Sequence, residues 1–395
     1  MSRRGALDTI VVGGGAIGAA LALALARDGF AVALVEARAP KLWRIEDDVD
    51  LRVVALAADA RALLDDLGAW PAIESARAGP YRRMRVFDAL APGELRFDAA
   101  DRGEASLGWI VENALIQHAL WQALANEPRV ELRCPAEVAA VSDGESSVEV
   151  VLSDGTRMSA RVVLAADGAA SPVRAMVGIE CDGRDYGQRA VVAHVGTVRP
   201  HESTAWQRFL PGGPLAFLPL ADGRSSIVWS LAETEAARVL ALADVAFRAE
   251  LGCAFDFRLG DVVSATRRAA FPLRMQTARR YVAGRVALVG DAAHVVHPLA
   301  GQGMNLGFRD VTCLRRVLHD ACERGGDIGA AHVLRRYERE RRSENALAAH
   351  ALDAIERVFG SANPAVAMGR GFALSAAGRL APFREVMMAV ASGRL

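Results

Sequence analysis

Two glycine-rich segments of this sequence carry residue types that could hold a dinucleotide. The first has the pattern Gly-x-Gly-x-x-Gly between an apolar run and an Ala- and Leu-rich run. Such glycines allow a tight turn, close approach of the backbone to a pyrophosphate and close helix packing. Glu36 ends the next apolar run, where its carboxylate can accept hydrogen bonds from ribose hydroxyls. The pattern alone does not distinguish NAD from FAD. Its candidate contact residues are Gly13, Gly15, Ala16, Ile17 and Gly18.

The second segment begins at Gly290-Asp291 and continues through a glycine-rich stretch to residue 307. An apolar run delivers the chain to Asp291, whose carboxylate is placed to bind sugar-alcohol hydroxyls. The glycines that follow let the backbone approach a flat ring, and a helix is expected to begin near Asn305. The positive end of that helix would stabilise negative charge on the ring. The candidate contact residues are Gly290, Asp291, Gly301, Gly303, Met304 and Asn305.

A third motif lies between these two and contains Asp167-Gly168, Ser171 and Arg174. It follows the apolar run Val162–Ala165. An Asp-Gly pair after a strand is common in turns, so this motif has meaning only together with the segment at 290–307.

The expected secondary structure places each motif at the end of a strand. Thr9–Val12, a helix ending near Arg27 and Ala31–Val35 predict a β-α-β unit around the first motif. Residues 187–270 are rich in strand patterns and predict a separate sheet that could roof a pocket. The expected strands there are Ala190–Val198, Trp206–Leu210, Leu215–Leu220 and Ser226–Ser230. The expected helices are Leu56–Leu67, Asn113–Asn126, Val311–Arg342 and Asn345–Phe359.

Length and composition limit the classes of function. A chain of 395 residues suggests two packed domains, and a net charge of zero gives no general attraction to nucleic acid. The five cysteines are scattered without a Cys-x-x-Cys pair, which argues against a disulfide framework or a zinc site. No signal-peptide pattern or membrane-spanning run is found. We therefore expect a cytoplasmic protein without a metal, and leave open a peripheral contact with a bacterial inner membrane.

In their order along the chain, the three motifs resemble those of the single-component (group A) aromatic hydroxylases that hold FAD. Residues 294–307 further resemble the ubiquinone-biosynthesis hydroxylase family, of the 2-polyprenylphenol and 2-polyprenyl-6-methoxyphenol hydroxylase type. Segments 109–113, 206–216 and 218–220 support the same resemblance, which extends from Asp8 to Met387–Arg394.

This resemblance implies a mixed α/β (α+β) fold in which a Rossmann-like FAD-binding domain carries an inserted β-sheet substrate domain and C-terminal helices. The FAD-binding domain would comprise 1–75, 105–180 and 275–345. The substrate domain would comprise 76–104 and 181–274, and the C-terminal helical region 346–395.

The resemblance also assigns roles to residues. Glu36 would hold the adenosine ribose, Arg52 would approach the flavin or its pyrophosphate, and Val138 would touch the adenine through its backbone. Asp291 would hold the ribityl chain, and Gly303, Met304 and Asn305 would line the isoalloxazine ring. The remaining assignments are to Asp167 and Arg174, in the motif that links FAD and NAD(P)H, and to Glu112. Many aromatic hydroxylases have Arg or Gln at the position of Glu112. The roles of phenol-acid hydroxylases are therefore not transferred to this residue.

The implied reaction uses NAD(P)H to reduce FAD, which activates O2 as a flavin C4a-hydroperoxide and hydroxylates the ring of a polyprenylated phenol. A base near the phenol would assist, and His194, His294 and His297 are candidates. Pro298 accompanies His294 and His297 as a candidate catalytic residue of the loop. The candidate pocket residues are Trp206, Phe209, Phe217 and Pro219, although core packing is the commoner use of such residues.

The sequence leaves two other functions open. The protein could hydroxylate a soluble aromatic compound, which would call for a buried arginine in place of an apolar tunnel. It could also be a non-catalytic flavin-binding subunit of a quinone-synthesis complex, although the intact Asp291 segment argues against this. The C-terminal segment Ala373–Met388 is a candidate helix for contact with a membrane or with other ubiquinone-biosynthesis proteins, and packing on the core is its alternative.

Overall fold

The first glycine motif connects strand β1 (Leu7–Val12) to helix α1 (Ala16–Arg27), and β2 (Val32–Val35) follows. β1 and β2 pair in parallel, so these elements form the β-α-β unit that the sequence predicts. The computed structural model describes residues 7–90, 93–296 and 303–360 of the chain.

The β-α-β unit belongs to an eight-stranded sheet with the order β18-β19-β11-β1-β2-β8, to which β10 and β9 are attached beside β11. β19, β11, β1, β2 and β8 run parallel. Because parallel strands end at one edge of a sheet, β1, β11 and β19 deliver the three motifs to the same edge. The other strands of this sheet are β8 (Val130–Arg133), β9 (Val138–Asp143), β10 (Val148–Leu152), β11 (Arg157–Ala165), β18 (Val282–Ala283) and β19 (Val286–Leu288).

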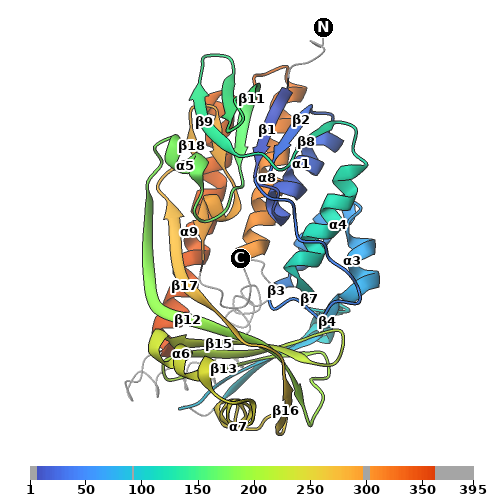
Figure 1. Cartoon of the computed structure of the whole chain (residues 1–395), viewed down its shortest axis with the longest axis vertical. Coiled ribbons are helices and arrows are strands. Elements are labelled where there is room, and N and C mark those ends of the chain that lie inside the picture. Colours follow the sequence, from blue (N-terminus) through green and yellow to red (C-terminus); the bar gives the residue numbers. More distant parts are fainter. Residues whose placement is uncertain (1–6, 91–92, 297–302, 361–395) are drawn as a thin grey trace.

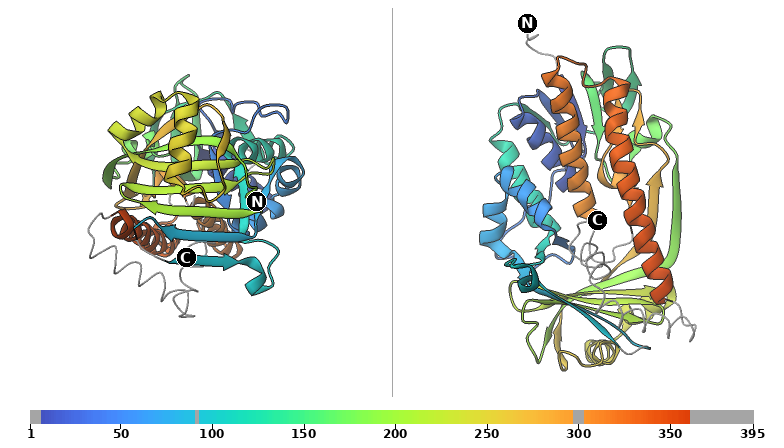
Figure 2. Two further views of the ribbon diagram at one scale, coloured as in Figure 1. Left: turned by 90° about the horizontal axis from the view of Figure 1, so that it is seen from below. Right: turned by 180° about the vertical axis from the view of Figure 1, so that it is seen from behind.

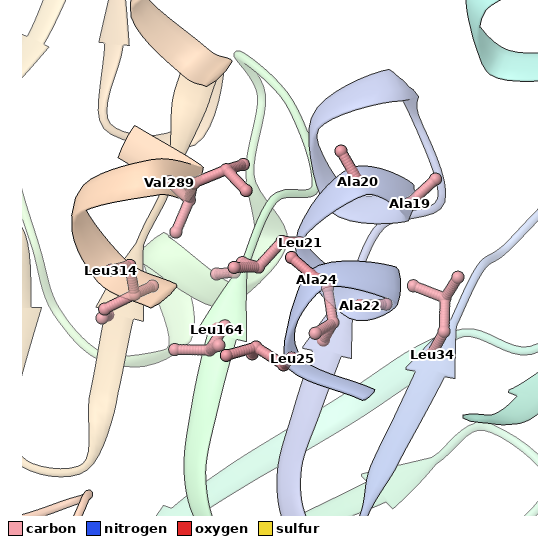
Figure 3. Close-up of a cluster of buried hydrophobic side chains, with 14 of the residues drawn as sticks. Ala19, Ala20, Leu21, Ala22, Ala24, Leu25, Leu34, Leu164, Val289 and Leu314 are labelled. Atoms are coloured by element: carbon pink, nitrogen blue, oxygen red, sulfur yellow. The ribbon is translucent and has the colours of Figure 1, made fainter. Parts of the chain in front are cut away.

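Helix α1 lies at the centre of the core of this part of the molecule. Leu21 and Leu25 of α1 lie close to Leu164 of β11, with Leu34 of β2 and Leu314 of α8 (Gly303–Glu323) nearby (Figure 3). Every residue of α1 from position 18 to position 26 is buried. A helix that is apolar on all sides is expected where other elements cover it on every side. The N-terminal end of α1 is thereby held firmly against the sheet.

A nine-stranded sheet lies across the other end of the molecule (Figures 1 and 2). Its order is β20-β17-β12-β15-β14-β13-β5-β6, and β16 pairs with β12. The long strands β12 and β17 run along one side of the molecule and connect this sheet to the region of the first sheet (Figure 1). Its strands are β5 (Arg83–Asp88), β6 (Glu94–Asp98), β12 (Cys181–Thr197), β13 (Thr204–Leu210), β14 (Gly213–Pro219), β15 (Ser225–Ala232), β16 (Val262–Ala265), β17 (Ala269–Ala278) and β20 (His294–Val295).

The two faces of this sheet belong to different apolar clusters. One face packs with α6 (Glu233–Ala241) and α7 (Asp244–Ala254), which lie on the outer side of the molecule (Figure 1). The opposite face, called here the inner face, shares a cluster with residues of α8 and of α9 (Ala331–Gly360). Since side chains alternate along a strand, neighbouring residues of one strand enter different clusters. The sequence patterns predicted the strands but did not reveal α6 and α7.

A small antiparallel sheet with the order β3-β7-β4 lies between the two large ones. Its strands are β3 (Val53–Leu56), β4 (Gly79–Tyr81) and β7 (Gly108–Glu112). The remaining elements are helices α2 (Ala58–Asp66), α3 (Trp70–Arg77), α4 (Asn113–Ala125) and α5 (Pro172–Met176), with the short 3-10 turns Ala99–Arg102 and Gly290–Ala292.

The predicted division of the last two helices is wrong. The sequence suggested a break between Arg342 and Asn345, but α9 continues through these positions, and the break lies between α8 and α9 at residues 324–330. Gly325 adopts a φ of 67° there, a conformation that favours glycine and ends α8. The polar residues near 342 interrupted the apolar pattern because some of them, including Asn345, face a buried polar cluster.

Within the part of the chain that the structure describes, no helix combines the length and the apolar character needed to cross a lipid bilayer.

Candidate active site

The three motifs meet at the N-terminal end of α1, where glycines allow them to pack closely. A Cβ on Gly13, whose φ is 102°, would lie 2.4 Å from the backbone oxygen of Ala166, next to Asp167. A Cβ on Gly307 would lie 2.7 Å from Cδ1 of Ile17, and one on Gly290 would lie 3.2 Å from Cγ2 of Ile17. Side chains would not fit at the first two positions without a shift. The structure thus brings together three segments that lie far apart in the sequence.

The start of α1 is suited to a phosphate group. No side chain caps this helix end, and its first turn contains no acidic residue. A Cβ built on Gly15, the N-cap, would meet nothing within 4 Å, so the backbone here is open to a ligand. Free N–H groups and the positive end of the helix dipole favour a pyrophosphate at this position.

Glu36 closes the site on the side of β2. Its Oε1 accepts a hydrogen bond from the backbone N–H of Arg38 at 2.9 Å, and its Oε2 accepts one from the N–H of Gly14. The backbone of Ala136 donates to the Glu36 carbonyl at 2.8 Å, which places Val138 at the start of β9 in the same neighbourhood. A half-buried carboxylate beside the glycine turn is in the right place to receive ribose hydroxyls.

The Asp167-Gly168 motif contacts the turn that carries Asp291. Asp167 accepts hydrogen bonds from the Ser171 hydroxyl at 2.6 Å and from the Val173 N–H at 3.0 Å. Burial raises the pKa of Asp167, and these hydrogen bonds oppose the rise. Arg174 then donates to the backbone oxygen of Ala292 at 2.9 Å. The motif therefore braces the turn that carries Asp291.

Asp291 and Arg52 are close enough for their charges to interact. Removal of water by the surrounding protein raises the pKa of Asp291, while the charges of His294 and Arg52 lower it. The Asp291 side chain is nevertheless exposed at the surface of its turn, and so is Arg52. Both residues can reach a cofactor lying over this edge of the sheet.

Arg52 follows a short loop that contacts both parts of the molecule. Asp50 donates its backbone N–H to Oε2 of Glu112 at 2.7 Å, and its carbonyl lies 3.1 Å from Nε2 of His194 on β12. Arg224, which directly precedes β15, pairs with Asp48 of the loop at 2.6 Å. Sequence reasoning assigned Glu112 to the cofactor. In the structure its carboxylate bonds this loop and lies 3.3 Å from Arg77, and its burial raises its pKa.

The first turn of α8 brings Gly303, Met304 and Asn305 to the site. The Asn305 side chain accepts from the Ala57 N–H at 3.0 Å and donates to the Ala55 carbonyl at 2.9 Å. It therefore fixes α8 against the end of β3. The predicted residues His297, Pro298 and Gly301 lie outside the described residues.

The other two candidate histidines are engaged in hydrogen bonds with protein groups. Nε2 of His294 lies 2.5 Å from Oδ2 of Asp310, and His294 is buried. His194 is also buried, and its Nε2 faces the Asp50 carbonyl. Neither histidine presents Nε2 to a substrate, so the identity of a base remains a prediction.

The predicted pocket residues divide between the two faces of the large sheet. Trp206 and Phe217 lie in the cluster with α7, where Phe217 stacks on Phe255 at 3.9 Å between ring centroids. They therefore pack the outer core. Phe209 lies in the inner-face cluster, and Pro219 ends β14 beside Gly79 of β4. Alternation along β13 explains why Trp206 and Phe209 separate.

Comparison with known proteins identifies the fold that this site belongs to. A family model described as an FAD binding domain matches residues 6–351. The chain belongs to this family. The protein is an FAD-dependent monooxygenase that uses NAD(P)H and O2. The open start of α1 at Gly15, together with Glu36 and Asp291, would hold the cofactor.

Similar proteins match along nearly their whole lengths. The chain is 37% identical over 386 residues to the 3-demethoxyubiquinol 3-hydroxylase of Escherichia coli (strain K12), with 98% of each chain covered. It is 38% identical over 388 residues to the ubiquinone hydroxylase UbiL of Rhodospirillum rubrum, covering 98% of this chain and 90% of the relative.

A solved structure also shares the fold. The p-nitrophenol 4-monooxygenase PnpA of Pseudomonas putida DLL-E4 superposes with a TM-score of 0.78 at 21% identity, and 98% of each chain is covered. At this identity the likeness concerns the fold alone.

Proposed function

We propose that this protein hydroxylates the aromatic ring of a polyprenylated phenol in ubiquinone biosynthesis. The observation that carries the proposal is the full-length similarity to relatives named as ubiquinone hydroxylases. The similarity to these relatives covers 98% of this chain. It therefore includes the nine-stranded sheet as well as the cofactor motifs.

The apolar inner face of the nine-stranded sheet is consistent with an apolar substrate. Ala205 and Phe209 on β13 share one apolar cluster with Met84 on β5. Val296 and Leu306, which lie within the glycine-rich segment at 290–307, belong to the same cluster. The segment that would line the flavin ring is therefore adjacent to a buried apolar cluster, beside which a prenylated phenol would gain from losing contact with water.

The buried arginines argue against a soluble aromatic acid as substrate. Among the described residues, the buried arginines are Arg285 and Arg341. Arg285 pairs with Asp327 at 2.6 Å, and Arg341 pairs with Asp310 at 2.7 Å. Both positive charges are already neutralised, so neither is offered to a substrate carboxylate.

The residues of the chain position the reactants. Bound FAD supplies the oxygen-activating chemistry, with NAD(P)H as the electron donor. Asp291 and Glu36 would hold the sugar hydroxyls of FAD, and the uncapped end of α1 would hold its phosphates. The positive end of α8 would stabilise negative charge on the ring. The apolar inner face would exclude water from the reacting groups.

A prenylated substrate also implies contact with a membrane surface, because its tail is carried in the lipid. We include such a peripheral contact in the proposal, together with contact with other ubiquinone-biosynthesis proteins. The segment Ala373–Met388, considered above for this role, lies outside the described residues. Co-sedimentation with phospholipid vesicles, with and without a prenylated phenol, tests the membrane contact.

Deletion of the gene, followed by mass spectrometry of quinone intermediates, tests the function. Accumulation of a prenylated phenol lacking one hydroxyl group is expected, and unchanged quinone intermediates would refute the assignment. With purified protein, a prenylated phenol should stimulate O2-dependent NAD(P)H oxidation more than a phenolic acid. The reverse order would favour a hydroxylase of soluble aromatics, and no stimulation by either compound would favour a non-catalytic flavin subunit.

A further inference from the structure

Asp310 is a fully buried carboxylate in the middle of α8, on the side that faces the Gly290-Asp291 turn. Oδ2 accepts a hydrogen bond from the Gly290 N–H at 3.0 Å and lies 2.5 Å from Nε2 of His294. Oδ1 accepts from Nε of Arg341 at 2.7 Å and from Nδ2 of Asn345 at 3.2 Å. Four donors therefore converge on one side chain.

These donors come from different parts of the site. Gly290 immediately precedes Asp291, and His294 begins β20 directly after the turn. Arg341 and Asn345 belong to α9, and Arg341 also donates to the Leu306 carbonyl in the first turns of α8 at 3.4 Å. Asp310 thus connects the turn that carries Asp291 to the helix end that would face the flavin ring.

The charge of Asp310 is maintained despite its burial. Burial alone would raise its pKa, but the positive charges and hydrogen bonds of His294 and Arg341 outweigh this effect and lower the pKa to about 2. An ionised carboxylate only accepts hydrogen bonds, so it satisfies all four donors together. A neutral side chain of the same size could not.

We propose that Asp310 is a positioning residue for FAD, which holds the Asp291 turn and the first turn of α8 in the relative geometry that the ribityl chain and the ring require. Asp310 acts through these two segments. His294, which sequence reasoning considered as a base, is one of the donors through which Asp310 holds the turn.

The substitution Asp310→Asn tests the proposal with little change of volume. An amide offers an acceptor on one side and a donor on the other, so two of the four hydrogen bonds are lost in either orientation. We expect the FAD dissociation constant of the refolded or deflavinated protein to rise about 10- to 100-fold, as when outer-shell partners of metal ligands are removed. The visible circular dichroism of bound flavin should also change, because the ring would sit differently.

Asp327→Asn is the matched control. It breaks the Arg285–Asp327 ion pair beside the start of β19, at the opposite end of that strand from Gly290. It should lower thermal stability while leaving FAD affinity and the flavin spectrum as in the wild type. If Asp327→Asn weakened FAD binding as much as Asp310→Asn, the effect would be a general loss of stability and the proposal would fail.

A second pair of variants covers the case in which Asp310→Asn does not fold. His294→Leu removes one of the two donors to Oδ2 of Asp310, whereas His294→Gln keeps an N–H group near the position of Nε2. We expect weaker FAD binding in His294→Leu and recovery in His294→Gln. Wild-type FAD affinity and flavin dichroism in a folded Asp310→Asn, or in His294→Leu, would overturn the proposal. Failure of the wild type itself to bind FAD would instead refute the cofactor assignment.

Discussion

Nε2 of His194 lies 3.1 Å from the backbone oxygen of Asp50, across the boundary between the large sheet and the loop that leads to Arg52. A carbonyl oxygen only accepts hydrogen bonds, so Nε2 carries the proton of the neutral ring. A second proton would have to go to Nδ1, which is buried and has no hydrogen-bond partner among the residues that the structure describes. The neutral ring is therefore the form that joins the two parts of the molecule.

This arrangement predicts that the protein loses stability in mild acid. Burial lowers the pKa of His194; the Asp50 and Val49 carbonyls and Asp48 oppose this, and Arg224 adds to it. The carboxylate of Asp222 also lies within electrostatic range. Below the ordinary histidine pKa of about 6.5 the unfolded chain binds a proton that the folded protein resists, so stability falls as the pH falls.

Urea unfolding of the wild type and of His194→Gln between about pH 8 and pH 5 tests this prediction. The amide of Gln keeps a donor near Asp50 and does not titrate, so its stability should depend less on pH. His201→Gln is a comparison variant: burial also lowers the pKa of His201, so this variant should lose that residue's own share of the pH dependence while the Asp50 contact of His194 stays intact. Parallel pH profiles for the wild type and His194→Gln would contradict the prediction.

Gly15→Ala should abolish FAD binding without harming the folded protein. Gly15 has an ordinary φ of −64°, and an added Cβ meets no protein atom within 4 Å. The methyl group would occupy the space in which the pyrophosphate approaches the backbone. We expect an unchanged melting temperature of the apoprotein and loss of detectable FAD binding in a fluorescence titration. Tight FAD binding by this variant would place the phosphates elsewhere.

Gly13→Ala, in contrast, is expected to destabilise the folded apoprotein itself. Its Cβ would lie 2.4 Å from the Ala166 oxygen, and its φ of 102° disfavours any side chain. The backbone strain alone costs about 1–3 kcal/mol, and the clash adds to it. We therefore expect the free energy of unfolding of the apoprotein to fall. Denaturant titration of both glycine variants without FAD separates this structural effect from the ligand effect at Gly15.

Glu36→Gln should weaken FAD binding by about 10- to 100-fold, because a hydrogen bond to a charged group contributes about 1.5–3 kcal/mol. Glu131→Gln on the neighbouring strand β8 is a suitable control, since Glu131 is exposed and pairs only with Arg133 on its own strand among the described residues. Titration of both apoproteins with FAD measures the difference. Equal affinities for the two variants would remove Glu36 from the cofactor site.

The local elements were easier to predict than the site. α4 begins at Asn113 as predicted, because its apolar spacing and its boundaries are local properties of the sequence. The contacts of Asp310 could not be predicted, since Gly290 and Arg341 reach it only through the tertiary fold. One signal was available: Asp310 lies beside Leu306, Val311 and Leu314 on the buried side of α8, where a carboxylate needs partners. Strand patterns likewise located Trp206 and Phe209 on one strand. Which face of the nine-stranded sheet is the inner one could not be predicted, because it depends on where α6 and α7 pack.

The inner face of the large sheet yields a last prediction, which separates two phenylalanines that the sequence placed together. Phe209 and Phe217 are both buried, but Phe209 lies in the inner-face cluster and Phe217 in the cluster with α7. Each change to alanine should cost about 3–5 kcal/mol of stability, because it leaves a cavity. At a temperature at which both variants are folded, Phe209→Ala should also raise KM for a prenylated phenol, whereas Phe217→Ala should keep it. Steady-state NAD(P)H oxidation measures this, and equal KM values for the two variants would exclude the inner face as the substrate surface.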